Sequence, residues 1–69
     1  MGKRIGQDEF IDLLRRAFDR AGGQSAWGRL HKLKPSYVSE VNRGKRPPSE
    51  KVLAALGLVR EETHYRRVG

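Results

Sequence analysis

Apolar residues recur at helical spacing in several stretches of the chain, and the longest of these covers residues 7–21. There Phe10, Leu14 and Phe18 fall on one face of a helix, with polar and charged residues between them. Acidic residues lie near the start of the stretch and arginines near its end, an order that suits the helix dipole. Two glycines follow directly. We therefore expect a core helix over residues 7–21.

Two shorter periodic stretches flank a tight junction at residues 31–34. Their apolar positions are Trp27, Leu30 and Leu33 in the first stretch and Val38 and Val41 in the second. The second begins at Pro35, which suits the first position of a helix because its missing N–H would have no intrahelical partner there. Gly44 follows and suits a left-handed helix end. The pattern predicts two helices of about two turns each, joined by about four residues, which is a helix-turn-helix arrangement.

The pattern in the C-terminal third of the chain predicts one more helix, followed by a segment in which the helical spacing of apolar residues is lost. Ser49 is a favourable cap for a helix whose inward residues would be Val52, Leu53 and Leu56. After this helix the period is lost, and alternation over residues 62–68 fits a short strand. Because a single strand is not stable by itself, it must pair with another strand or lie on the domain.

These elements predict one domain over residues 7–58, a flexible basic arm over residues 1–6 and a strand-like tail over residues 59–69. A chain of 69 residues allows one modest core and argues against a deep catalytic cleft. It has no cysteine, so neither a disulfide nor a thiolate metal site stabilises it. No apolar run approaches the ~20 residues of a membrane span and no signal peptide opens the chain, which predicts a cytoplasmic, nucleoid-associated protein.

The net charge of +7 is concentrated around the helix-turn-helix stretch. Residues 29–51 hold seven Lys/Arg against two Glu, a net +5, whereas residues 1–28 and 52–69 contribute +1 each. A basic excess that coincides with a motif of this shape favours a polyanionic partner over an ordinary solvated face. The two histidines and eight carboxylates show no metal-ligand spacing, and no catalytic or phosphate-loop motif occurs. We therefore expect no enzyme activity, no cofactor, no metal and no small-molecule substrate.

The faces of the helix that begins at residue 35 follow from its step of about 100° per residue. With the two valines turned inward, the outward face would carry Ser36, Ser39, Glu40 and Arg43, with Tyr37 and Asn42 on its flanks. Arginine suits guanine, glutamate accepts from cytosine N4, and serine is undiscriminating. A carboxylate that faces DNA phosphates weakens binding, so Glu40 needs a cytosine or a brace against Arg43 or Lys34. The alternative is that it pairs with a neighbouring arginine on a solvated surface.

Residues 24–44 resemble the helix-turn-helix of small Cro/repressor-type DNA-binding proteins. The matching positions are Gln24, Gly28, Leu33, Ser36-Tyr37-Val38-Ser39 and Gly44. The resemblance implies an all-α, four-helix, lambda-repressor-like domain, with or without a short C-terminal β-strand that pairs between subunits. It also implies that Gln24 touches a DNA phosphate and braces the recognition helix. One position departs from the pattern, because Lys32 stands where glycine is usual and must either accept a positive φ or use a different turn.

The function expected from these features is sequence-specific binding of double-stranded DNA by a transcriptional regulator, a repressor that occludes its operator with residues 35–43 in the major groove. Candidate base contacts are Lys34, Pro35, Ser36, Ser39, Glu40 and Arg43, and candidate phosphate contacts are Gln24, Arg29, Tyr37, Asn42, Lys45 and Arg46. A palindromic operator and a weak homodimer are expected, with the tail or the fourth helix as the interface. The alternative is an RNA- or protein-binding, antitoxin-like adaptor on the same scaffold. An RNA reader usually exposes aromatic rings, and only Tyr37 and Tyr65 remain for that role.

Overall fold

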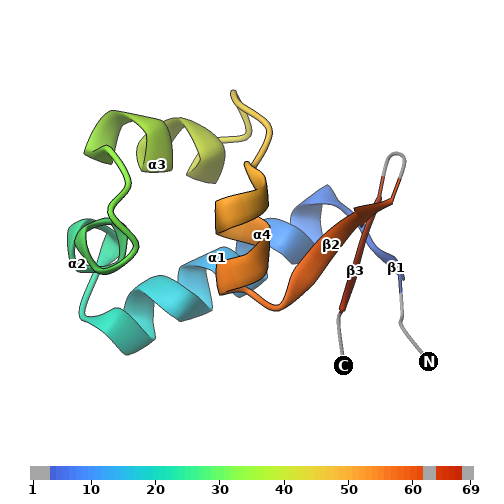
Figure 1. The fold of residues 1–69 in the computed structure, drawn as a ribbon, viewed down its shortest axis with the longest axis horizontal. Coiled ribbons are helices and arrows are strands. Elements are labelled where there is room, and N and C mark those ends of the chain that lie inside the picture. Colours follow the sequence, from blue (N-terminus) through green and yellow to red (C-terminus); the bar gives the residue numbers. More distant parts are fainter. Residues whose placement is uncertain (1–3, 62–63, 68–69) are drawn as a thin grey trace.

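The computed structural model describes residues 4–61 and 64–67 of the chain. Its elements are β1 (Arg4–Ile5), α1 (Gln7–Ala21), α2 (Gln24–Leu30), α3 (Pro35–Asn42), α4 (Glu50–Ala55), β2 (Leu58–Glu61) and β3 (His64–Arg67). α2 and α3 lie at one end of the molecule and the strands at the other, with α1 and α4 between them (Figure 1). The described chain is thus small and mainly helical, as expected, with a small sheet added to the four helices.

α1 has the bounds that the sequence predicts. It begins with acidic residues in its first turn and ends where Gly22 adopts left-handed backbone with φ 97°. Phe10, Leu14 and Phe18 are buried, so the predicted apolar face is the one that packs on the core. Ser49 caps α4 as predicted, because its Oγ accepts a hydrogen bond from the Val52 N–H at 3.4 Å.

The sheet is antiparallel, with β3 in its centre and the order β1-β3-β2. Ile5 of β1 and Arg60 of β2 both lie opposite Tyr65 of β3. Tyr65 is buried and packs against Phe10 of α1, with ring centroids 5.0 Å apart. The predicted C-terminal strand therefore exists as β3. The prediction did not include β2, because only one of its two ends carries a buried apolar side chain, Leu58, and no alternation marks the strand.

The prediction of a flexible arm is wrong for the last residues of that arm. Arg4 and Ile5 pair with β3, and the side chain of Ile5 is only 1% exposed. Burying an isoleucine side chain is worth about 1.5–3 kcal/mol, which is enough to hold a two-residue strand in place. Residues 1–3 lie outside the described residues.

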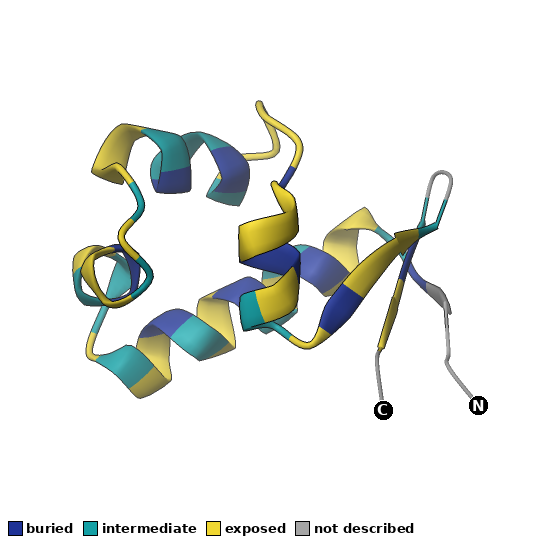
Figure 2. Cartoon of the chain, in the orientation of Figure 1, coloured by how far each residue is buried: buried dark blue, intermediate teal, exposed yellow. Residues whose placement is uncertain are grey.

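The core fills the space between the inner faces of the helices and the sheet, where dark blue segments face one another in Figure 2. Its buried members are Ile5, Phe10, Leu14, Phe18, Trp27, Val38, Val41, Val52, Leu53, Leu58 and Tyr65. Trp27 was predicted to belong to it and meets the ring of Phe18 edge-on at 5.3 Å between centroids. Leu30 was grouped with Trp27 by its spacing, but it is 67% exposed because it lies at the outer end of α2.

β3 pairs on both sides within the chain, which changes what the tail can do. The tail was expected to offer a strand for pairing between subunits, but β1 and β2 already occupy both edges of β3. Residues 62–63 and 68–69, which belong to the same predicted tail, lie outside the described residues. The outer edges of the sheet are those of β1 and β2.

Candidate nucleic-acid interface

The turn between α2 and α3 is closed by two backbone hydrogen bonds around a residue in left-handed conformation. The Lys32 N–H donates to the Arg29 carbonyl at 3.1 Å, and the Leu33 N–H donates to the Gly28 carbonyl at 2.8 Å. This pair of bonds is the Schellman motif that ends many helices, usually with glycine in the left-handed position. Here that residue is Lys32, with φ 56°. Of the two alternatives that the sequence left open, the chain therefore accepts the positive φ.

Close packing of α2 on α3 sets which face of α3 is exposed. Gly28 is buried, and a Cβ added to it would lie 3.3 Å from Cγ2 of Val38, so a glycine is what lets the two helices approach this closely. Val38 and Val41 are 2% and 1% exposed. The inward face of α3 is the predicted one, and this fixes the direction of its polar side chains.

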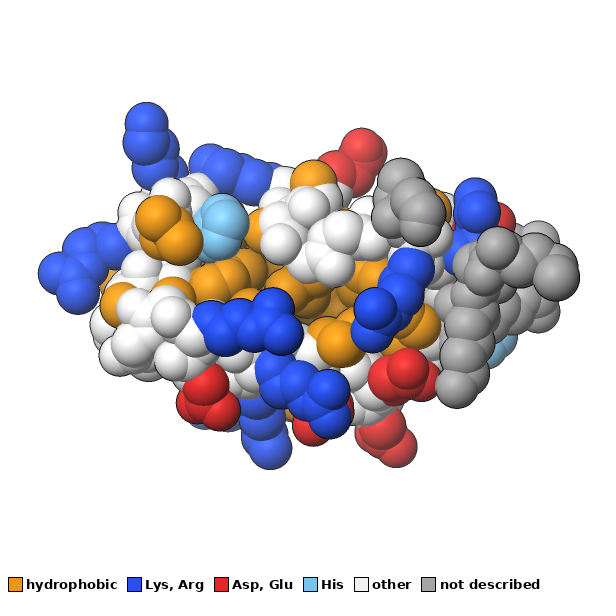
Figure 3. Space-filling view, turned by 90° about the horizontal axis from the view of Figure 1, so that it is seen from below, with side chains coloured by type: hydrophobic (Ala, Val, Ile, Leu, Met, Phe, Trp, Pro, Cys, Tyr) orange, Lys and Arg blue, Asp and Glu red, His pale blue; other side chains and the backbone are white. Residues whose placement is uncertain are grey.

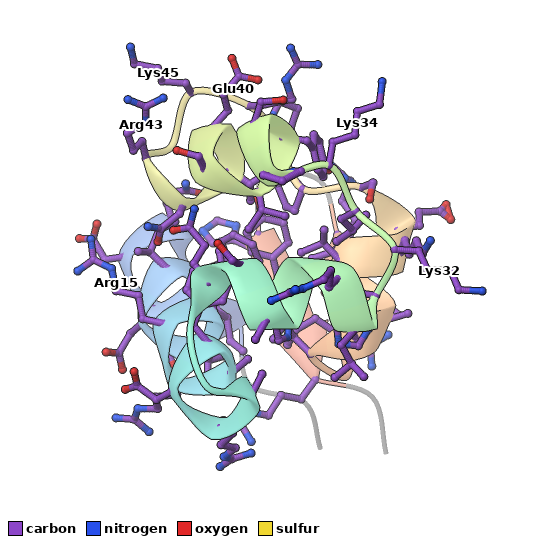
Figure 4. All side chains as sticks on the ribbon, turned by 90° about the vertical axis from the view of Figure 1, so that its left-hand side faces the viewer. Arg15, Lys32, Lys34, Glu40, Arg43 and Lys45 are labelled. Carbon is purple, nitrogen blue, oxygen red and sulfur yellow. The ribbon has the colours of Figure 1, made fainter. Side chains whose placement is uncertain are left out.

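The outward face of α3 carries short polar side chains with cations around them. Pro35, Ser36 and Arg43 are exposed, and Ser39 is half-buried. Figure 4 views this end of the molecule, with Glu40 and Arg43 projecting outward from α3, Lys45 beyond them and Lys34 at the opposite end of the helix. The candidate base contacts from the sequence thus form one continuous surface.

Glu40 pairs with a neighbouring arginine, which is the alternative that the sequence left open for it. Its Oε1 accepts a hydrogen bond from Nε of Arg46 at 2.9 Å, and neither Arg43 nor Lys34 braces it. Arg46 also lies over the ring of Tyr37, with its guanidinium carbon 6.0 Å from the ring centroid. Arg46 was predicted as a phosphate contact, but in this structure its charge is already shared with a carboxylate. The Glu40 side chain is 37% exposed, so the pair is solvated and easily exchanged.

Tyr37 also ties α3 to the loop before α4. Its hydroxyl oxygen accepts a hydrogen bond from the Ser49 N–H at 2.7 Å. Its ring is half-buried against the core. The predicted phosphate contact at Tyr37 would therefore have to share a hydroxyl that already holds the N-terminal end of α4.

The side-chain amide of Asn42 on α3 contacts one side chain on each of two other helices. Its Nδ2 donates to Oε1 of Gln24 on α2 at 3.4 Å, and its Oδ1 accepts from Nε of Arg15 on α1 at 3.5 Å. Both distances exceed the usual range of about 2.7–3.2 Å for N–H···O bonds, so these contacts orient the side chains more than they stabilise the fold. Gln24 does contact the helix that the resemblance implies it braces. Arg15 was not among the predicted residues, because it lies 27 positions before Asn42 and only the packing of α1 on α3 brings it there.

Two predicted phosphate contacts differ in their placement. Lys45 is exposed just after α3, beside Arg43, and extends away from the protein (Figure 4). Arg29 is exposed in the last turn of α2. It lies about 100° around the helix from Gly28, the residue that packs on α3, so it is to the side of the face that contacts α3.

A shallow depression beside α3 is lined by residues of α3, of the turn between α2 and α3 and of the loop before α4. It is lined by Lys32, Lys34, Ser36, Glu40 and Arg46, among others, so three cations border it against one carboxylate. Within the described residues, no group of three or more metal-ligating side chains could hold a metal ion. None of the helices in the described ranges is long and apolar enough to cross a membrane.

The candidate interface therefore consists of an exposed polar helix face, a cationic border and side-chain contacts between α3 and the neighbouring helices. Comparison of the chain with family models, with curated proteins and with solved structures gives no match.

Proposed function

We propose that the protein binds double-stranded DNA sequence-specifically, with α2 and α3 acting as a helix-turn-helix and α3 entering the major groove. The observation that carries the proposal is the outward face of α3, where Ser36, Ser39 and Arg43 are accessible together on one helix. The major groove is about 12 Å wide and admits one α-helix. The side chains that would reach base edges are then those opposite Val38 and Val41.

The chemistry of this face suits base recognition at a few positions. Arg43 can donate two hydrogen bonds to a guanine, and the serines can donate or accept. Glu40 can accept from cytosine with Oε2, because only Oε1 is bonded to Arg46, or with both oxygens if the exposed pair opens, which is inexpensive. Arg46 would then be free for a phosphate, so one rearrangement would supply a base contact and a phosphate contact.

The cations around α3 suit the two phosphate backbones that border the groove. Lys34 and Lys45 lie at opposite ends of α3, and Lys32 and Arg15 lie on either side of it (Figure 4). Contacts of this kind supply most of the affinity that does not depend on sequence. The bonds from Asn42 to Gln24 and Arg15 would hold α3 at the angle that places both sets of contacts.

Duplex DNA is favoured over single-stranded RNA by the placement of the aromatic rings. Tyr65, one of the two rings that the sequence left for stacking, is 9% exposed, and Tyr37 is half-buried with its hydroxyl bonded. The other three rings belong to the core. No Phe, Tyr or Trp side chain among the described residues is therefore fully exposed for bases to stack on.

Regulation by occlusion follows from binding in the major groove, since a protein seated there excludes others from the same base pairs. We propose a repressor of this kind acting on a palindromic operator as a weak homodimer, which doubles the bases that are read. Because β3 is enclosed, the outer edge of β2 and the exposed side of α4 are the surfaces that we assign to the subunit contact.

Selection of bound duplexes from a random pool at physiological salt tests the proposal. We expect a palindromic consensus. Arg43→Ala should reduce the discrimination between bases at one position of this consensus by about 1–3 kcal/mol. Lys45→Ala should weaken binding to all duplexes alike and lower the magnitude of the slope of log K against log salt concentration by about 0.9.

Arg20→Ala is the matched control, because it removes the same charge from an exposed site on α1, on another face of the molecule. It should leave the consensus unchanged. Failure to enrich any duplex, or an equal effect of Arg20→Ala and Arg43→Ala on specificity, would refute the assignment of α3 as the reading helix.

A further inference from the structure

A second surface, away from α3, is a groove lined by both apolar and basic side chains. It lies between α1 on one side and the ends of α2 and α4 on the other, and its volume is about 420 Å³. Its apolar lining includes Leu13 and Ala17 of α1, Trp27 and Leu30 of α2, and Leu56 after α4. Figure 3 shows this face from below, with an apolar strip running between the basic side chains.

Leu30 is the most exposed apolar side chain that lines the groove. It is 67% exposed, more than any other large apolar side chain in the described chain. Trp27, one turn before it, is 3% exposed and forms part of the floor of the groove. An exposed leucine beside a concave apolar surface leaves apolar area in water that a partner could cover.

The border of the groove carries positive charge. Arg16 and Arg20 lie along α1, Arg67 lies on β3, and His31 stacks on Trp27 with ring centroids 4.7 Å apart. Among residues 4–61 and 64–67, no Asp or Glu lines the groove. Arg16 pairs with Asp12 at 3.1 Å, but both side chains are more than half exposed, so this pair screens the border only weakly.

We propose that this groove binds an acidic amphipathic segment of a partner protein, with apolar side chains against Trp27 and Leu30 and carboxylates toward Arg16 and Arg20. A helix laid in a groove between helices is a common mode of peptide recognition, with anchors every three or four residues. Charge complementarity decides the occupant. A second copy of this chain would bring its own arginines against these, so the same face of another copy is disfavoured.

The groove and the proposed DNA-binding face use different sides of α2. Gly28 and Gln24 face α3, whereas Trp27 and Leu30 line the groove. The proposal therefore does not depend on the proposed function, and both surfaces could be occupied at once. A partner recruited in this way would be brought to whatever α3 binds.

Selection from a displayed library of random peptides of about 12 residues identifies the occupant, because three helical turns span the anchors of such a groove. We expect a consensus of two or more large apolar residues flanked by Asp or Glu. Trp27 is the only tryptophan and lines the groove, so its fluorescence reports binding of the synthetic consensus peptide. Leu30→Ser should weaken that peptide at least about tenfold, which is about 1.4 kcal/mol. Arg20→Glu should weaken it and shift the selection toward basic peptides.

Two controls separate the groove from the rest of the surface. Val59→Ser removes the second exposed large apolar side chain of the described residues, and Lys45→Glu reverses a charge beside α3. Neither variant should change peptide affinity. The proposal fails if no acidic amphipathic peptide is enriched, or if Leu30→Ser and Val59→Ser act alike. It also fails if the groove instead drives Leu30-dependent dimerisation or binding to vesicles of anionic phospholipid.

Discussion

Because Lys32 has a left-handed conformation, we predict that one substitution at this position raises the free energy of unfolding. Most substitutions in a protein lower it. Three helices end with the same pair of backbone bonds, around Gly22 after α1, Lys32 after α2 and Gly44 after α3. The φ values are 97°, 56° and 76°, and only the second belongs to a residue with a Cβ. Lys32→Gly should therefore stabilise the fold.

The size of the effect follows from two opposing terms. A left-handed conformation costs an L-residue about 1–2 kcal/mol. Glycine removes that cost, but it also makes the unfolded chain more flexible, which stabilises the unfolded state by about 0.4–1 kcal/mol. We expect a net gain of about 0.5–1 kcal/mol, or a rise in Tm of about 2–8 °C for a domain of this size.

Urea unfolding followed by circular dichroism measures this gain, and two further variants isolate its cause. Lys32→Ala removes the same charge and keeps the Cβ, so its stability should remain within about 0.5 kcal/mol of the parent. Gly22→Ala places a Cβ where nothing lies within 4 Å, so its cost should be conformational alone and about 1 kcal/mol in the opposite direction. If Lys32→Gly and Lys32→Ala have the same stability, the gain comes from charge and the argument from φ is wrong.

Four other substitutions test the packing, each by urea unfolding. Ile5→Ala should cost about 2–5 kcal/mol because Ile5 is buried, whereas no loss would mean that β1 does not hold in solution. Trp27→Ala should cost about 3–5 kcal/mol of a total of only about 5–15 kcal/mol, and a variant that melts like the parent would place Trp27 outside the core. Gly28→Val should cost about 1–3 kcal/mol by overpacking against α3, and a neutral result would show that the helices can separate. Tyr37→Phe should cost about 0.5–1.5 kcal/mol through the lost bond from Ser49, and an unchanged midpoint would show that water replaces it.

The parts of the fold that the sequence predicted are those where a long periodic pattern met a clear helix end. α1 has the predicted bounds because its apolar face is repeated over four turns and glycine follows it. Ile5 and Leu30 were misplaced for the opposite reason. A two-residue strand has no period, and a seven-residue helix is too short for its spacing to distinguish an inward leucine from one at an exposed end.

In the candidate site too, features that follow from the local sequence could be predicted, whereas features that follow from the packing of distant elements could not. The outward face of α3 could be predicted because the direction of each side chain follows from Val38 and Val41 alone. The partners of those side chains could not. Glu40 meets Arg46 because the chain turns back after Gly44, and Asn42 meets Arg15 because α1 packs against α3. Such pairs depend on how elements are placed, which no local pattern encodes.

α2 contributes residues to both surfaces, and it depends for its stability on packing against the rest of the protein. Isolated helices shorter than about 12–15 residues are marginal in water, and α2 has seven residues with a glycine among them. Its stability therefore comes from Trp27 in the core and from Gly28 against α3. A ligand on either surface binds only the folded form and stabilises it by linkage. DNA on α3 and a peptide in the groove would thus each raise the free energy of unfolding of the domain that contains α2, and the two increments would add.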